Sequence, residues 1–335
     1  MPELRKDLIR DAWVVIAAGR ALKPNDFPIN KNGIRFMGNS GRCPFCAGHE
    51  ELTPPEITAY REKESLPDTP DWSIRTIPNK YSAFSLIGDL TPDTTGINTR
   101  CDGIGQHEVI VETPEHDVEL HEFNIDKIYL VFKMLKERYI ALAKDERIKY
   151  IQIYKNRGIF AGASLEHSHS QILALPMVPE VNKGIQRYYE KESSCLICDM
   201  IEQERLSGER VIYEGQEFIV ICPYASRFAY EIWVIPTAHN RHFGHISDKE
   251  LQELAIISQK LLQTIIASLD NPSYNIVINS APVNGETEDG YHWFMELTPR
   301  LIITAGVEIA AGIYMNPVAP ELAARLFREK LKFIG

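Results

Sequence analysis

The chain has 335 residues, of which 44% are hydrophobic and 24% charged, and its formal net charge is -10. This length accommodates two domains of ordinary size. The acidic balance argues against broad nucleic-acid binding, which needs a basic face, and no apolar run is long enough to cross a bilayer. The opening stretch MPELRKDLIRDAW has charges where a secretory signal needs apolar residues. We therefore expect a cytoplasmic protein with no membrane or nucleic-acid partner.

The predicted elements occur twice, in the same order. The first half contains, in order, a C-x-x-C pair at 43–46, the strand-like HEVIVETPEH at 107–116, a helical stretch at 126–145, a strand at 148–156, and HSHSQILALP at 167–176. The second half contains a C-x-x-C pair at 195–198, YEIWVIPTAH at 230–239, a helical stretch at 248–270, a strand at 274–282, and YHWFMELTPR at 291–300. Apolar residues return every three or four positions in both helical stretches, and β-branched residues dominate the strands.

This repetition predicts an α+β fold built from two tandem repeats. Each repeat is a mainly antiparallel sheet with a long crossover helix, and the predicted domains are residues 1–185 and 186–335. We expect the strands at 12–17 and 72–79 to extend the first sheet. A helix is predicted over 320–335.

The two C-x-x-C pairs indicate zinc, which takes four thiolate or imidazole ligands in a tetrahedron. The repeated histidines supply the missing ligands, so the predicted sets are Cys43, Cys46, His116 and His167, and Cys195, Cys198, His239 and His292. Iron in place of zinc, or a second site without metal, is left open. His107, His242 and His245 lie nearby in the sequence and compete with the predicted histidines for a ligand position. Thioredoxin-like redox chemistry is disfavoured because neither pair is expected to open a helix after a βαβ pattern.

His169 is the extra histidine of the first half. If residues 167–175 form a strand, His167, His169 and Gln171 share one face, and His169 stays uncoordinated. The second half has Trp293 and Phe294 after its histidine, which predicts that function is retained in the first half only.

A neutral, unligated imidazole is a nucleophile that needs no base. Gln171, Ser164 and Asn156 offer donors beside His169, and the small residues around Gly162 let main-chain N–H groups approach an oxyanion. Donors around a nucleophilic histidine are typical of phosphoryl or nucleotidyl transfer.

Four boxes resemble the galactose-1-phosphate uridylyltransferase family of the histidine triad superfamily: RCPFCAGHE, VETPEH, GASLEHSHSQ and HWFMELTPR. The resemblance implies a ping-pong reaction between a nucleoside diphosphate sugar and a hexose 1-phosphate through a nucleotidyl-histidine, usually in a homodimer. The roles it implies are His169 as nucleophile, Gln171 and Ser164 on phosphoryl oxygens, Asn156 and Arg20 near the phosphates, Asn79 near the nucleotide, and Glu308 and Asn316 on sugar hydroxyls.

The residues flanking His169 depart from the commonest family pattern, which has proline before it and glycine after it. This chain has Ser168 and Ser170, and its H-S-H-S-Q form is similar to a plant-type branch that includes ADP-glucose phosphorylases. Uridylyl transfer is the main interpretation and adenylyl transfer to phosphate the alternative. A histidine-triad hydrolase is disfavoured by Gln171 in place of a third histidine, and a non-catalytic zinc-stapled adaptor by the acidic charge.

Overall fold

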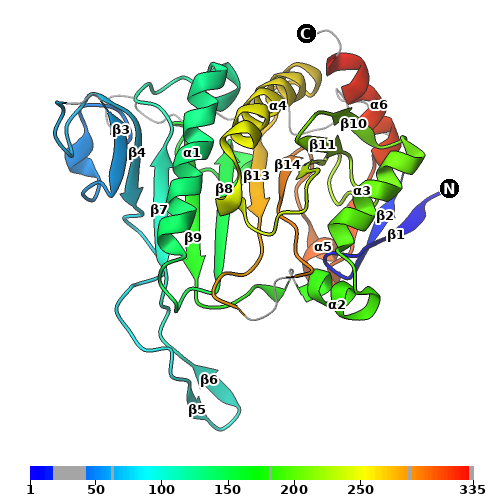
Figure 1. Cartoon of the computed structure of the whole chain (residues 1–335), viewed down its shortest axis with the longest axis horizontal. Helices are drawn as coiled ribbons and strands as arrows, with labels where there is room; N and C mark the ends of the chain where they lie inside the picture. Colours follow the sequence, from blue (N-terminus) through cyan, green and yellow to red (C-terminus); the bar gives the residue numbers. More distant parts are fainter. Residues whose placement is uncertain (18–42, 62–63, 181–182, 286–288, 332–335) are drawn as a thin grey trace.

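The computed structural model describes residues 1–17, 43–61, 64–180, 183–285 and 289–331. Within these ranges, ten strands form one antiparallel sheet that runs through both halves of the chain (Figure 1). From one edge to the other its strands are β10 (Val211–Glu214), β11 (Phe218–Ile221), β12 (Ile232–Pro236), β14 (Phe294–Pro299), β13 (Tyr274–Asn279), β8 (Tyr150–Arg157), β9 (His169–Leu175), β7 (Gln106–Val111), β4 (Trp72–Pro78) and β3 (Thr58–Arg61).

The sheet consists of two copies of one five-strand order. The strands β3, β4, β7, β9 and β8 form the first copy, and β10, β11, β12, β14 and β13 form the second. In each copy a long helix follows the third strand, and the chain then returns to the innermost strand. The innermost strands β8 and β13 pair with each other, with Asn156 opposite Asn275. The predicted α+β fold of two tandem repeats is confirmed, whereas the division at residue 185 stays a prediction.

The crossover helices α1 (Ile125–Leu142) and α4 (Asp248–Ser268) lie side by side on one face of the sheet (Figure 1). Asn124 caps α1 by accepting from the Lys127 amide, and Ser247 forms a capping box with Glu250 at the start of α4. The apolar side of both helices packs into the main core, as their periodicity predicts. None of the helices in the described ranges is both long and apolar enough to span a bilayer.

Two smaller cores cover the other face of the sheet. In the second half, α2 (Lys183–Glu192) and α3 (Leu196–Ser207) pack there, with Ile197 against Trp233 and its neighbours. In the first half, Phe45 packs with Val109 and Val111, which alternate along β7 with the α1-facing Ile110. This first-half face carries the predicted site.

A separate three-stranded sheet contains β1 (Glu3–Asp7), β2 (Ala12–Ile16) and β15 (Tyr314–Asn316). The expectation that residues 12–17 extend the first sheet is therefore wrong. β2 pairs antiparallel with β1 and parallel with β15 from the far end of the chain. Its local pattern predicts a strand but does not specify the partner. The strand at 72–78 does join the first half, as β4.

The remaining elements are short. A hairpin of β5 (Asp93–Thr95) and β6 (Asn98–Arg100) projects from the body (Figure 1). The helix α5 (Gly306–Ala311) precedes β15, and α6 (Pro320–Leu331) is the helix predicted at the C-terminal end of the sequence.

A buried ion pair supports β9 from the helix side. The Lys155 ammonium lies 2.7 Å from the Glu112 carboxylate, 3.0 Å from the Ser168 hydroxyl and 3.2 Å from the His169 carbonyl oxygen. Ser168 and Ser170 both donate to Glu112. Burial alone would raise the pKa of Glu112, but the Lys155 charge and these donors hold that pKa below its usual value.

We predict that Lys155→Met lowers the free energy of unfolding by about 3–5 kcal/mol, because Glu112 would stay buried without its counter-charge. Lys191→Met, which removes an exposed partner of Glu192, is the control and should cost less than about 1 kcal/mol. Chemical denaturation of the metal-loaded proteins measures both. Equal, small losses for the two variants would contradict the prediction.

Candidate functional site

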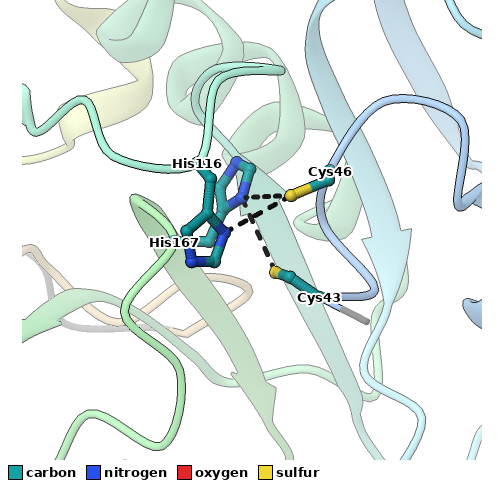
Figure 2. Close-up of side chains that lie close together, drawn as sticks. All are labelled: Cys43, Cys46, His116 and His167. Atoms are coloured by element: carbon teal, nitrogen blue, oxygen red, sulfur yellow. Dashed lines mark hydrogen bonds between the residues drawn. The ribbon is translucent and has the colours of Figure 1, made fainter. Parts of the chain in front are cut away.

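The first predicted metal set comes together from three segments. Cys43 and Cys46 lie in the turn before β3, His116 follows β7, and His167 precedes β9 (Figure 2). The Cys46 sulfur is 3.3 Å from His116 Nδ1 and 3.7 Å from His167 Nδ1, and the Cys43 sulfur is 3.7 Å from His167 Nδ1. Two sulfurs and two imidazole nitrogens that converge in this way fit a structural zinc ion.

The tautomer of His167 also fits a metal ligand. Its Nε2 lies 2.7 Å from the Thr113 carbonyl oxygen, which can only accept, so Nε2 carries the proton and Nδ1 presents its lone pair to the cysteines. Burial lowers the pKa of His167 to about 4, so the imidazole is neutral, as coordination requires.

The second predicted set repeats this arrangement. The Cys198 sulfur is 3.4 Å from His239 Nδ1 and 3.5 Å from His292 Nδ1. The angle between the ring planes of His239 and His292 is 76°, and that between His116 and His167 in the first set is 77°. In each set the four ligand atoms lie within 4.8 Å of one another. Both sets therefore suit a metal ion, and their donors suit zinc.

The second cysteine pair opens a helix, but that helix follows α2 directly and not a βαβ unit, so the expectation about both pairs holds. Cys195 is the N-cap of this helix, α3. A helix N-terminus favours a thiolate in redox enzymes as well as in metal sites. The two histidines that face Cys198 are the observation that favours a metal site here.

His169 lies beside the first set but outside it. Its Nδ1 is 2.7 Å from the His167 carbonyl oxygen, so Nδ1 carries the proton and Nε2 keeps its lone pair. The Phe45 ring packs edge-on at 5.3 Å between ring centroids. The His169 side chain is 5% exposed, and burial, followed by the Lys155 charge, lowers its pKa. The imidazole is thus oriented and held neutral.

Gln171 shares this face of β9, as the strand alternation predicts, and it belongs to a polar cluster. Its Oε1 is 2.8 Å from His107 Nε2, 3.1 Å from the Tyr154 hydroxyl and 3.5 Å from Asn79 Nδ2. Asn79 was expected near the nucleotide, and the structure brings it beside Gln171. Tyr154 was not predicted. The alternation of side chains along β8 could have indicated Tyr154, because it places Tyr154 on the same face of the sheet as Gln171.

Asn156 lies on the same face and is held by the second half of the chain. Asn275 Nδ2 donates to Asn156 Oδ1 at 2.8 Å and to the Ala161 carbonyl at 2.9 Å. The Asn156 NH₂ is left on the side of Gly162, whose φ of +82° suits a residue without a Cβ. Asn275 could not be found from the sequence because it contacts the site only through the β8–β13 pairing.

The other predicted site residues are placed differently. Ser164 is exposed in the loop before β9. Glu308 caps α5, where its carboxylate accepts from the Ala305 amide. Asn316 is fully buried, and its amide bonds to main-chain atoms of residues 226, 228 and 318. Arg20 lies outside the described residues. The predicted roles of these four residues stay predictions.

The competing histidines are not part of either ligand set. His107 belongs to the Gln171 cluster, and His242 lies 3.2 Å from the Tyr139 hydroxyl. Two cavities, of about 320 and 380 Å³, are lined by other residues, among them Tyr188 and Arg187. Neither cavity contains His169 or Gln171, so the candidate site around these two residues is identified from its side chains and not from a cavity.

The second half has no counterpart to His169. Phe294 occupies that position on β14, two residues after His292, and packs on Trp233 with 4.7 Å between ring centroids. The difference between the halves that the sequence indicates is thus confirmed at this position.

Two family models match the chain. The N-terminal domain of galactose-1-phosphate uridyl transferase matches residues 75–179, and its C-terminal domain matches residues 182–317. An ADP-glucose phosphorylase from Arabidopsis thaliana is 36% identical, over 98% of this chain and 93% of the relative. A galactose-1-phosphate uridylyltransferase from Thermotoga maritima is 31% identical, over 98% of both chains.

Solved structures agree with these matches. The crystal structure of an Arabidopsis thaliana ADP-glucose phosphorylase with bound ADP-glucose has a TM-score of 0.80 and 34% identity, and the match covers 98% of this chain and 99% of that one. A uridylyltransferase structure at 22% identity, with a TM-score of 0.74 over 100% of this chain and 99% of that one, shares the fold. The chain therefore belongs to the galactose-1-phosphate uridylyltransferase family.

Proposed function

We propose that the protein is a hexose-1-phosphate nucleotidylyltransferase that cleaves ADP-glucose with inorganic phosphate through an adenylyl-His169 intermediate. The observation that carries this proposal is the hydrogen bond from His169 Nδ1 to the His167 carbonyl. It leaves Nε2 as a free nucleophile on the face that also carries Gln171, Asn79 and Asn156.

The proposed reaction has two displacements at the same phosphorus. First, the Nε2 lone pair attacks the α-phosphorus of ADP-glucose, the bond to the bridging oxygen breaks, and glucose 1-phosphate leaves. Second, an oxygen of inorganic phosphate attacks the adenylyl-histidine, the P–N bond breaks, and ADP leaves with neutral His169 restored. The amides of Gln171 and Asn156 donate to the phosphoryl oxygens, where charge develops.

The choice of adenylyl over uridylyl transfer is supported by the relatives and by the H-S-H-S-Q segment. The Arabidopsis ADP-glucose phosphorylase is the more similar of the two relatives described above, at 36% against 31% identity. Uridylyl transfer between UDP-glucose and galactose 1-phosphate, the main interpretation of the sequence, is therefore less well supported than its alternative.

The two Cys/His sets are proposed to hold zinc in a structural role. Cys43, Cys46, His116 and His167 would hold one ion, which fixes the turn that carries Phe45 against the strand that carries His169. Cys195, Cys198, His239 and His292 would hold the other. The homodimer and the cytoplasmic location expected from the sequence stay predictions, as do sugar contacts by Glu308 and Asn316.

The proposed adenylyl-histidine can be detected directly. Incubation with ADP-glucose labelled at the α-phosphate should give an acid-labile label on the protein, and His169→Ala should abolish it while retaining the full metal content. His121→Ala, which changes a half-buried histidine on the helix side, is the control and should keep the label. Label retained by the His169 variant would disprove the proposed nucleophile.

The substrates of adenylyl and uridylyl transfer can be compared by rate. The kcat/KM of ADP-glucose with phosphate should exceed that of UDP-glucose with galactose 1-phosphate by about 100-fold, a ratio that pocket contacts readily supply. Initial rates of glucose 1-phosphate release measure both pairs. The opposite ratio would return the assignment to uridylyl transfer, and equal release without any phosphate acceptor would indicate a hydrolase.

The two Cys/His sets should differ in their effect on the reaction. Cys43→Ser and Cys198→Ser should each remove one of the two metal ions per chain, measured by elemental analysis. Only the Cys43 variant should lower the adenylylation rate, by about 10- to 100-fold, because only its set contacts the segment that orients His169. Equal rate losses in both variants would contradict this division of roles.

A further inference from the structure

The polar cluster around Gln171 brings together four separate segments. His107 lies on β7, Tyr154 on β8 and Gln171 on β9, and Asn79 follows β4. These strands are neighbours in the sheet (Figure 1), and Tyr154 is the direct cross-strand partner of Gln171. All four side chains are partly buried. In this environment the hydrogen bonds within the cluster determine the direction of the oxygen and of the NH₂ group in the Asn79 and Gln171 amides.

The orientation of the Asn79 amide follows from a main-chain bond. The Tyr81 N–H, which can only donate, lies 2.9 Å from Asn79 Oδ1. Asn79 Oδ1 is therefore turned toward residue 81. Its Nδ2 faces the cluster, where it donates to Gln171 Oε1 at 3.5 Å.

The orientation of the Gln171 amide follows from its neighbours. Asn79 Nδ2 and the Tyr154 hydroxyl both offer protons to Gln171 Oε1, and His107 Nε2 also lies beside this atom. A reversed amide would place the Gln171 NH₂ against the Asn79 NH₂, two groups that cannot bond to each other. The oxygen thus faces the cluster, and the NH₂ points away from it.

The shortest of these bonds comes from His107. At 2.8 Å from an acceptor oxygen, His107 Nε2 carries a proton. Burial lowers the pKa of His107, which keeps the ring neutral, although the Gln171 bond opposes this shift. A neutral donor orients the amide without placing a charge beside the phosphates.

We propose that His107 and Tyr154 are positioning residues that hold the Gln171 amide with its NH₂ directed at the phosphoryl oxygens. This inference rests on the proposed function and deepens it. Neither residue needs to touch the substrate, because both act on the acceptor end of the Gln171 side chain. Without them, Gln171 would rotate and present its oxygen to the phosphate for part of the time.

A double-mutant cycle tests the proposal in single-turnover adenylylation by ADP-glucose. His107→Leu should slow adenylylation by about tenfold, less than the 10²–10³ expected for Gln171→Ala, which removes the donor itself. In the Gln171→Ala background, His107→Leu should change the rate less than about twofold. Independent, multiplying effects would show that His107 acts other than through Gln171 and would overturn the proposal.

Conservative variants separate orientation from packing. His107→Gln keeps a donor near the Nε2 position and should recover most of the rate lost in His107→Leu. Tyr154→Phe removes the hydroxyl that donates to Gln171 and should also slow adenylylation. The control is Tyr129→Phe, which removes a hydroxyl that donates to Asp248 at 3.5 Å and should leave the rate unchanged. Melting temperatures show whether each variant folds. Should His107→Leu fail to fold, the same cycle is run with Tyr154→Phe in its place. Rate effects of Tyr154→Phe and Gln171→Ala that multiply independently would then overturn the proposal.

An NMR measurement separates this proposal from the proposed function. The side-chain NH₂ resonances of Gln171, assigned by their loss in Gln171→Ala, should be well dispersed in the wild type and shift toward free-amide positions in His107→Leu and Tyr154→Phe. Unchanged resonances would overturn the proposal even in an active enzyme. A wild type that forms no adenylyl-enzyme would overturn the proposed function and leave this readout intact.

Discussion

The bonds of His167 hold the site together. Its Nδ1 faces the two cysteine sulfurs of the first set, its Nε2 donates to the Thr113 carbonyl, and its own carbonyl accepts from His169 Nδ1. Turning the His169 ring would break a buried hydrogen bond and leave a polar group unsatisfied, which costs about 1–3 kcal/mol. The first Cys/His set therefore orients the proposed nucleophile, His169, through one shared residue, and His169 Nε2 stays outside the set.

The alternation of side chains along β9 places the buried ion pair and the candidate site on opposite faces of the sheet. Ser168 and Ser170 point to the helix side, where they complete the buried Glu112–Lys155 pair, and His169 and Gln171 point to the opposite face. The donors in the polar cluster around Gln171, and at Asn156, are neutral imidazole, hydroxyl and amide groups. This agrees with a chain whose net charge is -10, in which an anionic substrate has to be met by local donors.

The two halves share a scaffold but differ at the positions of His169 and Gln171. Phe294 replaces His169, and Glu296 lies opposite Trp233 as Gln171 lies opposite Val109. Glu296 is not available to a substrate, because Arg10 and Arg227 both bind it and Asn279 donates to it. The second half thus has the same sheet order, crossover helix and cysteine-histidine set, while apolar packing and ion pairs occupy the face that carries the proposed active site in the first half.

The sequence by itself determined the repeat, the long helices, both cysteine-histidine sets and the spare histidine. Strand alternation and helical periodicity are local properties of the chain, and the same order of cysteine pairs and histidines in both halves identifies the ligands. Only the tertiary structure decided that β2 pairs with β15, that Asn275 reaches across to Asn156, and that His107 and Tyr154 surround the Gln171 oxygen. These contacts join residues far apart in the chain, and their partners are fixed by sheet register and burial, which no local pattern specifies.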